Sequence, residues 1–393
     1  MAGGRQNDMW ALTPGVTEAS FRIHSAKEAA EAVVSLAREA ARAGTFGVGG
    51  LLMDRAGRVL AYATNAVVLQ GVVRDPTAHA ERQLIDWLFD AQRRGLAIAP
   101  RDLIIISSVD PCAMCAGAIL ASGTNAVALA EDTSSGIHSE GRPHRIPSQL
   151  WPEAERLFGL FQVRARPGDA RHIAQLLSDE IPAPLLKDAE TCFLDSLERT
   201  RRFVSNCSLP DSAPETQAEA YEWSKLRAIA KGLSSNVAWP DEPILLQDFL
   251  TQQQTAFLAN DGCVLIDERR RVLLTAQGFE TLSPARTSIL EIIRAYVWFR
   301  NAAEKELGIT LPHQRMCSLI KLRPPSPSRK AVMELGAIGS FLEGRHLAYP
   351  LPALGFIQAD NSHVAENIVA SLPPYYTSVI KLTVGQMNMP API

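Results

Sequence analysis

Two short stretches of the sequence combine residue types that bind a metal and move protons. His79 and Glu81 stand two positions apart. Further along, Cys112 and Cys115 stand three positions apart, directly after Pro111. One imidazole and two thiolates supply three ligands to a tetrahedral zinc ion and leave its fourth position for water, whereas a structural zinc site closes all four positions. The pattern therefore predicts a catalytic zinc centre with His79, Cys112 and Cys115 as ligands.

Glu81 is not needed as a ligand, because three are already present. A carboxylate beside such a zinc ion takes a proton from the metal-bound water, passes it to a ring nitrogen and then protonates a departing amine. The predicted reaction is attack of zinc-bound hydroxide on an amidine-like ring carbon, followed by loss of ammonia. A redox pair or a structural zinc site is the alternative explanation of Cys-x-x-Cys alone, and the His-x-Glu pair weighs against it.

Two predicted helices position these residues. We expect one helix to begin at the His-x-Glu pair and to end near Gly95, and a second to run from Cys112 to Ser122. The unpaired N–H groups and partial positive charge of a helix N-terminus favour a thiolate over a thiol. Short apolar strands alternate with the helices, which indicates a three-layer α/β/α domain with a largely parallel sheet and the site at the strand ends.

Length and composition indicate an ordinary globular protein with room for two domains. The chain has 393 residues, 47% of them hydrophobic and 21% charged, and its net charge is −3. Such a balance gives no general attraction to nucleic acid. The N-terminus lacks the apolar segment of a signal peptide, and no apolar run is long enough to span a membrane. Only one pair among the six cysteines is closely spaced, so we expect a cytoplasmic protein without a disulfide framework.

The second part of the chain repeats the first without its chemistry. The matching segments are 49–60 with 262–273, and 117–119 with 336–338. Thr287 stands where the histidine ligand would be, and Ile289 stands where the glutamate would be. We therefore predict a second, degenerate deaminase-like α/β domain that cannot bind catalytic zinc. The alternative is a chance similarity between two α/β domains, because strand–turn–strand patterns recur widely.

These patterns divide the chain into four parts. The predicted parts are a lead-in over 1–24, a catalytic domain over 25–180, a linker over 181–215 and an inactive domain over 216–393. The linker contains Arg199, Arg201 and Arg202. A solvated helix face explains that cluster better than a nucleic-acid contact does.

The two motifs also carry a family resemblance. Asp75-Pro-Thr-Ala-His-Ala-Glu81 and Pro111-Cys-Ala-Met-Cys-Ala-Gly-Ala-Ile119 resemble the cytidine deaminase-like superfamily, and within it the branch of bacterial tRNA adenosine, guanine and cytosine deaminases. The resemblance covers roughly residues 25–165. It implies a five-stranded sheet between helices, a zinc site and commonly a dimer. It also implies that Asn65 binds substrate, and we expect Ala80 and Pro111 at the substrate as well.

Three functions are compatible with these features. The first is a zinc-dependent hydrolytic deaminase of a small amino-substituted purine or pyrimidine, as a nucleobase, nucleoside or nucleotide. The second is an RNA- or DNA-editing deaminase with the second domain as a nucleic-acid platform, which predicts a basic surface joining 199–202, 269–271 and the zinc cleft. The third is a non-catalytic scaffold stabilised by zinc, which would have no use for Glu81.

The partners and the edge of the pocket are less defined. We expect a homodimer or an intramolecular pseudo-dimer, in which the second domain caps the pocket or replaces a neighbouring subunit. Glu131, Asp132 and His138 follow the last predicted strand of the catalytic domain. They are candidates for a polar flap over the pocket.

Overall fold

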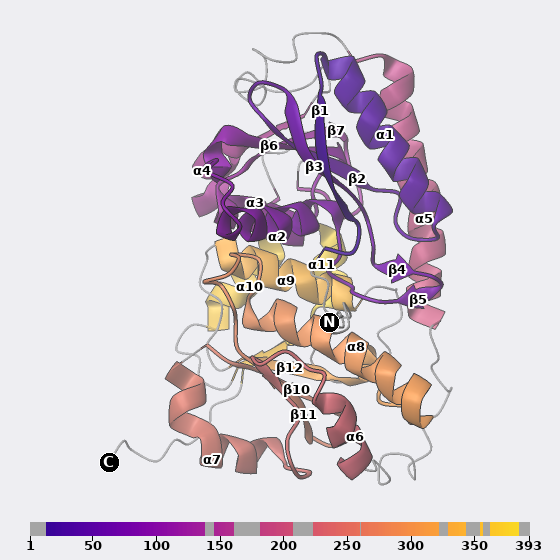
Figure 1. The fold of residues 1–393 in the computed structure, drawn as a ribbon. Helices are drawn as coiled ribbons and strands as arrows, with labels where there is room; N and C mark the ends of the chain where they lie inside the picture. Colours follow the sequence, from indigo (N-terminus) through magenta and orange to yellow (C-terminus); the bar gives the residue numbers. More distant parts are fainter. Residues whose placement is uncertain are drawn as a thin grey trace.

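The computed structural model describes residues 13–137, 145–160, 181–206, 223–259, 261–321, 329–342, 354–356 and 362–384. These residues form two halves, each built around a six-stranded sheet (Figure 1). We refer to residues 13–206 as the first half and to residues 223–384 as the second half. No helix in the described ranges is both long and apolar enough to cross a lipid bilayer.

The first sheet is mixed. Its strands are β1 (Val16–Arg22), β2 (Gly49–Asp54), β3 (Arg58–Thr64), β6 (Leu103–Val109), β7 (Asn125–Ala130) and β8 (Phe158–Leu160), in the spatial order β1-β3-β2-β6-β7-β8. The pairs from β1 to β6 are antiparallel, and β6, β7 and β8 are parallel. The expectation of a largely parallel sheet is therefore wrong. A tight turn joins only β2 to β3, and β1 and β6 pair with this hairpin from either side in the antiparallel sense. Helical crossovers through α3 and α4 join β6 to β7 and β7 to β8, and these pairs are parallel.

Helices cover both faces of this sheet, which confirms the three-layer α/β/α arrangement. The helices are α1 (Ala26–Arg42), α2 (Ala80–Arg93), α3 (Ala113–Ser122), α4 (Trp151–Leu157) and α5 (Ala183–Asn206). α1 and α5 pack together over one face, whereas α2 and α3 lie on the opposite side (Figure 1). A two-stranded hairpin of β4 (Val68–Leu69) and β5 (Val72–Val73) precedes α2.

Two segments differ from the predicted division of the chain. The expected lead-in contains β1, an edge strand that is largely exposed and so lacks an apolar pattern. Because of β1, the sheet has six strands rather than the five that the resemblance implies. The expected linker contains the long helix α5, since its proline, Pro184, lies in the first turn, where a missing N–H is tolerated. The buried stripe of α5 includes Ala189, Phe193, Leu197 and Val204.

The second half contains a six-stranded sheet of the same topology. Its elements are α6 (Trp223–Ala230), β9 (Val237–Ala238), α7 (Leu246–Ala259), β10 (Cys263–Ile266), β11 (Val272–Ala276), α8 (Ser288–Leu307), β12 (Ser318–Lys321), α9 (Arg329–Phe341), β13 (Leu354–Phe356), α10 (Ser362–Ser371), α11 (Pro374–Val379) and β14 (Leu382–Val384). The order β9-β11-β10-β12-β13-β14 has the same succession of antiparallel and parallel pairs as the first sheet. Even the register shift between Leu52 and Met53 recurs between Leu265 and Ile266.

The turn after β2 also recurs in detail after β10. Asp54 accepts the backbone N–H of Arg58 at 3.0 Å, and its other oxygen lies 3.1 Å from the Arg58 side chain. Asp267 accepts the backbone N–H of Arg271 at 2.9 Å, and its other oxygen lies 2.7 Å from the Arg271 guanidinium. Segments 49–60 and 262–273 therefore share a local structure as well as a sequence pattern.

The two halves meet through α3 and α9, which lie side by side in the middle of the molecule (Figure 1). Gly117 of α3 packs on the backbone of Met333, and Gly336 of α9 packs on the backbone of Met114. A Cβ atom at either glycine would overlap the facing main chain. Both helices are buried along most of their length because one hydrophobic core extends across the boundary between the halves.

A second set of contacts is reciprocal in the same way. The carboxylate of Asp75 lies 3.1 Å from the side chain of Arg294, and Ser283 donates a hydrogen bond of 2.6 Å to Asp86. Asp86 and Arg294 occupy the same position in α2 and α8, six residues after the first helical residue. Asp75 and Ser283 each precede a proline that leads into these helices. The contact surface is thus the same patch on both halves, as in a two-fold symmetric dimer.

Candidate metal centre and its pocket

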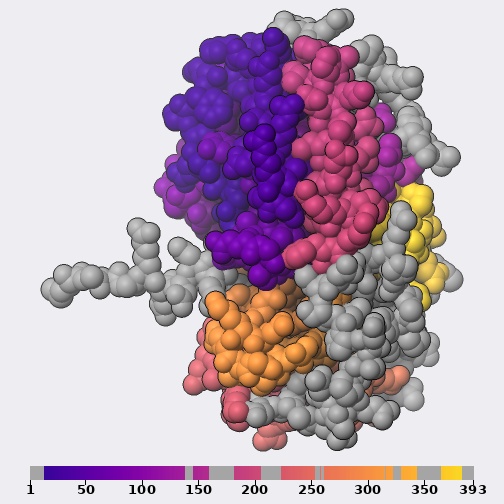
Figure 2. Space-filling view, turned by 90° about the vertical axis from the view of Figure 1, so that its right-hand side faces the viewer, coloured from indigo at the N-terminus to yellow at the C-terminus, as the bar shows by residue number. Residues whose placement is uncertain are grey.

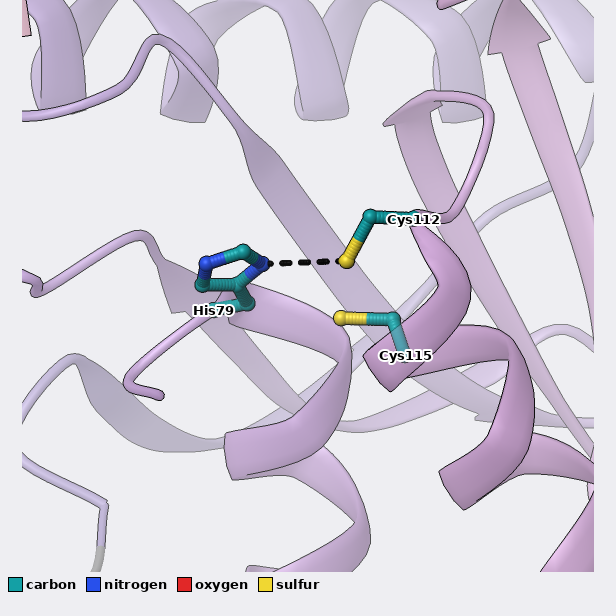
Figure 3. A group of neighbouring side chains, drawn as sticks. All are labelled: His79, Cys112 and Cys115. Atoms are coloured by element: carbon teal, nitrogen blue, oxygen red, sulfur yellow. Dashed lines mark hydrogen bonds between the residues drawn. The ribbon is translucent and has the colours of Figure 1, made fainter. Parts of the chain in front are cut away.

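Helix starts bring the three predicted zinc ligands together. His79 is the N-cap of α2 and Cys112 is the N-cap of α3, and both have extended backbone conformations that turn their side chains out of the helices. Cys115 lies in the first turn of α3 on the same side as Cys112. The Nδ1 atom of His79 is 3.4 Å from the Cys112 sulfur, and the ligand atoms of all three residues lie within 4.8 Å of one another (Figure 3).

These residues fit a zinc ion. Zn–S and Zn–N bonds of about 2.3 and 2.0 Å in a tetrahedron place neighbouring ligand atoms about 3.5 Å apart, which agrees with the 3.4 Å between the His79 nitrogen and the Cys112 sulfur. In the described ranges this is the one cluster of three metal-binding side chains. The predicted cofactor zinc therefore suits this site, and His79, Cys112 and Cys115 are the side chains that would hold it.

The two thiols differ in acidity. A hydrogen bond from Cys115 holds the pKa of the Cys112 thiol well below its usual range, against the effect of burial, and nearby His79 lowers it further. Burial raises the pKa of Cys115, and the neighbouring charge of Cys112 adds to that rise. One thiolate is therefore favoured before the metal binds, and zinc binding must displace the proton of the second.

Glu81 is a buried carboxylate beside the ligands. Its side chain accepts a hydrogen bond of 2.7 Å from the Ser107 hydroxyl and one of 3.4 Å from the Cys115 thiol. Burial raises the pKa of Glu81, and the Ser107 hydrogen bond opposes that rise. Sequence reasoning missed Ser107. Its signal is the polar pair Ser107-Ser108 at the end of an otherwise apolar strand, where Ser108 also accepts the N–H of Gly49 at 3.1 Å.

A pocket opens beside the metal ligands, and three parts of the chain line it. Its walls include Phe46, Asn65, His79, Glu81, Asp110 and Asp132 from the body of the first half, Phe193, Leu197 and Arg201 from α5, and Ser340, Tyr375 and Tyr376 from the second half. Aromatic rings form much of the wall, and polar groups sit among them. This mixture suits a flat heterocycle with a few hydrogen-bonding atoms.

The predicted substrate residues have different places. Asn65 lines the pocket, and its side-chain oxygen accepts hydrogen bonds of 2.6 Å from Thr45 and 3.0 Å from the N–H of Val67. These bonds fix the amide plane and leave its NH2 group for the pocket. Ala80 and Pro111 are not among the residues that line it, so their substrate contacts stay predictions.

The described start of the expected polar flap, residues 131–137, is a partly buried turn at this edge of the pocket. Asp132 lines the pocket, but its carboxylate accepts hydrogen bonds of 2.5–3.1 Å from the hydroxyl and N–H groups of Ser134 and Ser135. Burial raises the pKa of Asp132. Its oxygens are occupied within the turn, so Asp132 shapes the pocket wall. Glu131 is not among the lining residues, and His138 lies outside the described residues.

Arg201 is not on a solvated helix face, as the sequence suggested for its cluster. It is buried in the pocket wall, and its guanidinium carbon lies 4.7 Å from the centre of the Tyr375 ring. Arg199 and Arg202 are exposed, as predicted. Arg199 donates a hydrogen bond of 2.5 Å to the carbonyl of Ala41 in α1. Figure 2 shows α5 running beside the N-terminal segments and reaching the yellow C-terminal residues. Arg201 is buried, contrary to the prediction, because α5 packs on the first half instead of forming a solvated linker between the halves.

The second half has an ion pair near the position that corresponds to the metal site. Lys321 in β12 pairs with Cys263 across the sheet, as Ser107 pairs with Gly50 in the first half. The Lys321 amino group lies 2.9 Å from the carboxylate of Glu334, and both side chains are almost fully buried. Glu334 is two residues before Gly336, as Cys115 is two residues before Gly117. Thr287, in place of the histidine, caps α8 with its own hydroxyl.

Comparisons with known proteins found one family model and several solved structures. Residues 24–131 match the model of the cytidine and deoxycytidylate deaminase zinc-binding region. No curated protein matches the sequence. A structure from work on A-to-I editing by tRNA:A34 deaminases is 28% identical, over 28% of this chain and 81% of that one, with a TM-score of 0.25. A guanine deaminase from Nitrosomonas europaea is 17% identical, over 50% of this chain and 95% of that one, with a TM-score of 0.27. Residues 24–131 of the chain therefore carry the zinc-binding region of the cytidine deaminase-like superfamily.

Proposed function

We propose that this protein is a zinc-dependent hydrolytic deaminase that releases ammonia from a small amino-substituted purine or pyrimidine, as a base, nucleoside or nucleotide. The position of Glu81 carries the proposal. Glu81 is 3% exposed, and among the described residues no cationic side chain forms a hydrogen bond with it. It lines the same pocket as His79 and Cys112, and its carboxylate accepts a hydrogen bond from the buried Cys115 thiol. A structural metal site has no use for such a costly buried acid.

Each side chain then has a defined task. Bound zinc supplies an activated water at neutral pH. Glu81 takes and returns protons at its carboxylate, and the Ser107 hydroxyl holds that carboxylate in one orientation. The NH2 group of Asn65 orients the ring, and Phe46 and the α5 side chains exclude bulk water from it. Exclusion of water strengthens every one of these polar interactions.

We also propose that the second half is a deaminase-like domain that has lost its metal site and replaces a neighbouring subunit within the same chain. The matching sheet order, the shared register shift and the reciprocal contacts of Gly117 and Gly336 support this. Ser340, Tyr375 and Tyr376 support the same idea, because they line the pocket of the first half.

Two of the six arginines predicted to form the basic surface of an editing enzyme are used inside the protein, which weighs against a continuous surface, whereas the other four are exposed. Arg201 is buried in the pocket wall, and Arg271 pairs with Asp267 in its own turn. Phe193, Leu197 and Arg201 of α5 line the pocket beside the metal ligands, and they leave less room there for a polynucleotide than for a single base. A scaffold without catalysis is disfavoured by the buried Glu81.

The test is ammonia release by the zinc-loaded full chain from a panel of bases, nucleosides, nucleotides and short single-stranded RNA and DNA. Glu81→Gln is the matched variant, since it keeps the shape of the side chain and removes its proton-transfer capacity. We expect turnover of a free compound, lost by a factor of about 10²–10⁴ in the variant at unchanged zinc content. Turnover of oligonucleotides alone would replace this proposal with the editing function. Silence across the panel with zinc bound would contradict it.

A further inference from the structure

Tyr376 brings a hydroxyl group from the second half to the metal-site pocket. It belongs to α11, is 1% exposed and lines the pocket together with Cys112 and Glu81. Its oxygen accepts a hydrogen bond of 3.1 Å from the backbone N–H of Ala113, the first residue of α3. Ala113 directly follows the ligand Cys112, so the hydroxyl lies at the helix end that carries the metal ligands.

The proton of this hydroxyl is left for another partner. A tyrosine hydroxyl both accepts and donates hydrogen bonds, and the bond from Ala113 uses only the accepting side. Among the described residues, no group accepts the Tyr376 proton, and the ring is held edge-on against Tyr375 at 5.3 Å. A buried donor without an acceptor is costly. The open side of this residue is the pocket, where a bound molecule supplies the missing acceptor.

The neighbouring tyrosine shows the contrast. The Tyr375 hydroxyl donates a hydrogen bond of 3.1 Å to the carbonyl of Gly339 within the second half. Its ring face contacts the guanidinium of Arg201. The adjacent tyrosines thus differ in role: the Tyr375 hydroxyl is used inside the protein, whereas the Tyr376 hydroxyl retains its donor.

We propose that Tyr376 is a substrate-binding residue contributed by the second half, and that its hydroxyl donates a hydrogen bond to a ring nitrogen or exocyclic oxygen of the heterocycle. The identity of the ligand as a heterocycle rests on the proposed function. With Asn65 donating from the first half, the pocket then presents two hydrogen-bond donors from opposite sides of the boundary. Substrates with acceptor atoms on two edges of the ring are selected over those with one.

The experiment measures binding separately from turnover. Tyr376→Phe removes only the hydroxyl, and Tyr296→Phe is the matched control. Tyr296 is also fully buried in the second half, and its hydroxyl donates to the carbonyl of Pro312. Calorimetry with adenine, guanine and cytosine is run on zinc-loaded chains that carry Glu81→Gln, so that bound ligand is not consumed. We expect binding of the best ligand to weaken roughly tenfold or more in Tyr376→Phe and to stay unchanged in Tyr296→Phe.

Deaza analogues, in which C–H replaces one ring nitrogen, give a second readout on the unmodified Tyr376. An analogue that lacks the nitrogen contacted by Tyr376 should bind more weakly than its parent to the chain with Tyr376. The same analogue and its parent should bind equally to the Tyr376→Phe chain, which has already lost the hydrogen bond. This measurement decides the matter on the unmodified residue if Tyr376→Phe does not fold. If every deaza analogue binds as tightly as the parent heterocycle, Tyr376 does not contact a ring nitrogen. If Tyr376→Phe also binds the parent heterocycle as tightly as the unmodified chain does, Tyr376 does not contact an exocyclic oxygen either, and the proposal is wrong.

Zinc content and the absorption of the cobalt-substituted protein separate a structural role from a substrate role. If Tyr376→Phe alters the cobalt spectrum and leaves ligand affinity unchanged, the hydroxyl only holds α3 and the proposal is wrong. If the wild-type chain binds a heterocycle through Tyr376 but releases no ammonia, the proposed deaminase function fails and the Tyr376 contact stands. If the wild-type chain releases ammonia and Tyr376→Phe changes neither turnover nor binding, the deaminase function stands and the Tyr376 contact fails. Absence of any binding contradicts both.

Discussion

The carboxylate of Asp75 lies 3.1 Å from the guanidinium of Arg294, across the boundary between the halves. The same carboxylate lies 3.1 Å from Arg82, and Thr77 donates to it through its N–H and its hydroxyl. Burial alone raises the pKa of Asp75, but Arg294 and Arg82 outweigh burial and hold it below its usual value. The loop that leads to His79 is thus anchored to the other half by charge.

Replacement of Arg294 by leucine is expected to destabilise the protein. The change leaves Asp75 buried without one of its two arginines, and breaking a buried pair costs about 3–5 kcal/mol. Urea unfolding measures the loss. Arg94→Leu is the control, because Arg94 pairs with Glu18 at 2.9 Å on the exposed surface, where a pair contributes less than about 1 kcal/mol. Equal effects of the two substitutions would contradict this assignment.

The same ion pair predicts a pH dependence. The pKa of Asp75 is lower in the folded than in the unfolded protein, so the unfolded state binds more protons in acid and stability falls as the pH falls. The contribution is complete above the unfolded value of about 3.9 and is lost below it. The stability difference between wild type and Arg294→Leu should therefore shrink below about pH 4. A difference that stays constant down to pH 3 would show that Asp75 is not the responsible group.

Gly336→Ala is expected to damage the metal site from the other half of the molecule. A methyl group at Gly336 would overlap the backbone of Met114, the residue before the ligand Cys115. We expect a loss of about 2 kcal/mol or more in stability and weaker zinc binding in a chelator competition. The control is Gly44→Ala, where φ is +86° and the surroundings are open. That change costs about 1–2 kcal/mol in backbone strain but should leave zinc affinity unaltered.

The metal content is expected to be one zinc per chain, held by the single described cluster. Cys112→Ser should abolish it. Burial raises the pKa of Cys317 to about 12 and raises that of Cys263 further, so neither thiol is suited to a metal. Cys263→Ala should leave the zinc content unchanged by metal analysis. A second equivalent of zinc that disappears in Cys263→Ala would refute this assignment.

Local sequence was sufficient to predict the helix starts that bring the three candidate metal ligands together. His79, Cys112 and Cys115 are positioned by two helix N-termini, and the signals for a helix start are contained in a few neighbouring residues. The repeat of 49–60 in 262–273 was visible for the same reason, since a strand–turn–strand unit is also local. The three-layer arrangement follows from the alternation of strands and helices.

Features that depend on distant partners were not predictable in this way. Ser107 contacts Glu81 across the sheet, and Tyr376 reaches Ala113 from the far end of the chain. The prolines near the start of α5 predict a linker, and the apolar stripe that packs on the first half is a long-range feature that they obscure. Strand direction was wrong because an apolar run does not indicate on which side its partner lies or which way it runs.

The reciprocal interface has a consequence for how the molecule can change. In a homodimer, every substitution appears twice, on both sides of the axis. Here each substitution appears once, so the two corresponding contacts can differ. One of them is an ion pair between Asp75 and Arg294, and the other is a hydrogen bond from Ser283 to Asp86. Translation of one chain also fixes the ratio of the two halves at one to one, and dilution cannot separate them.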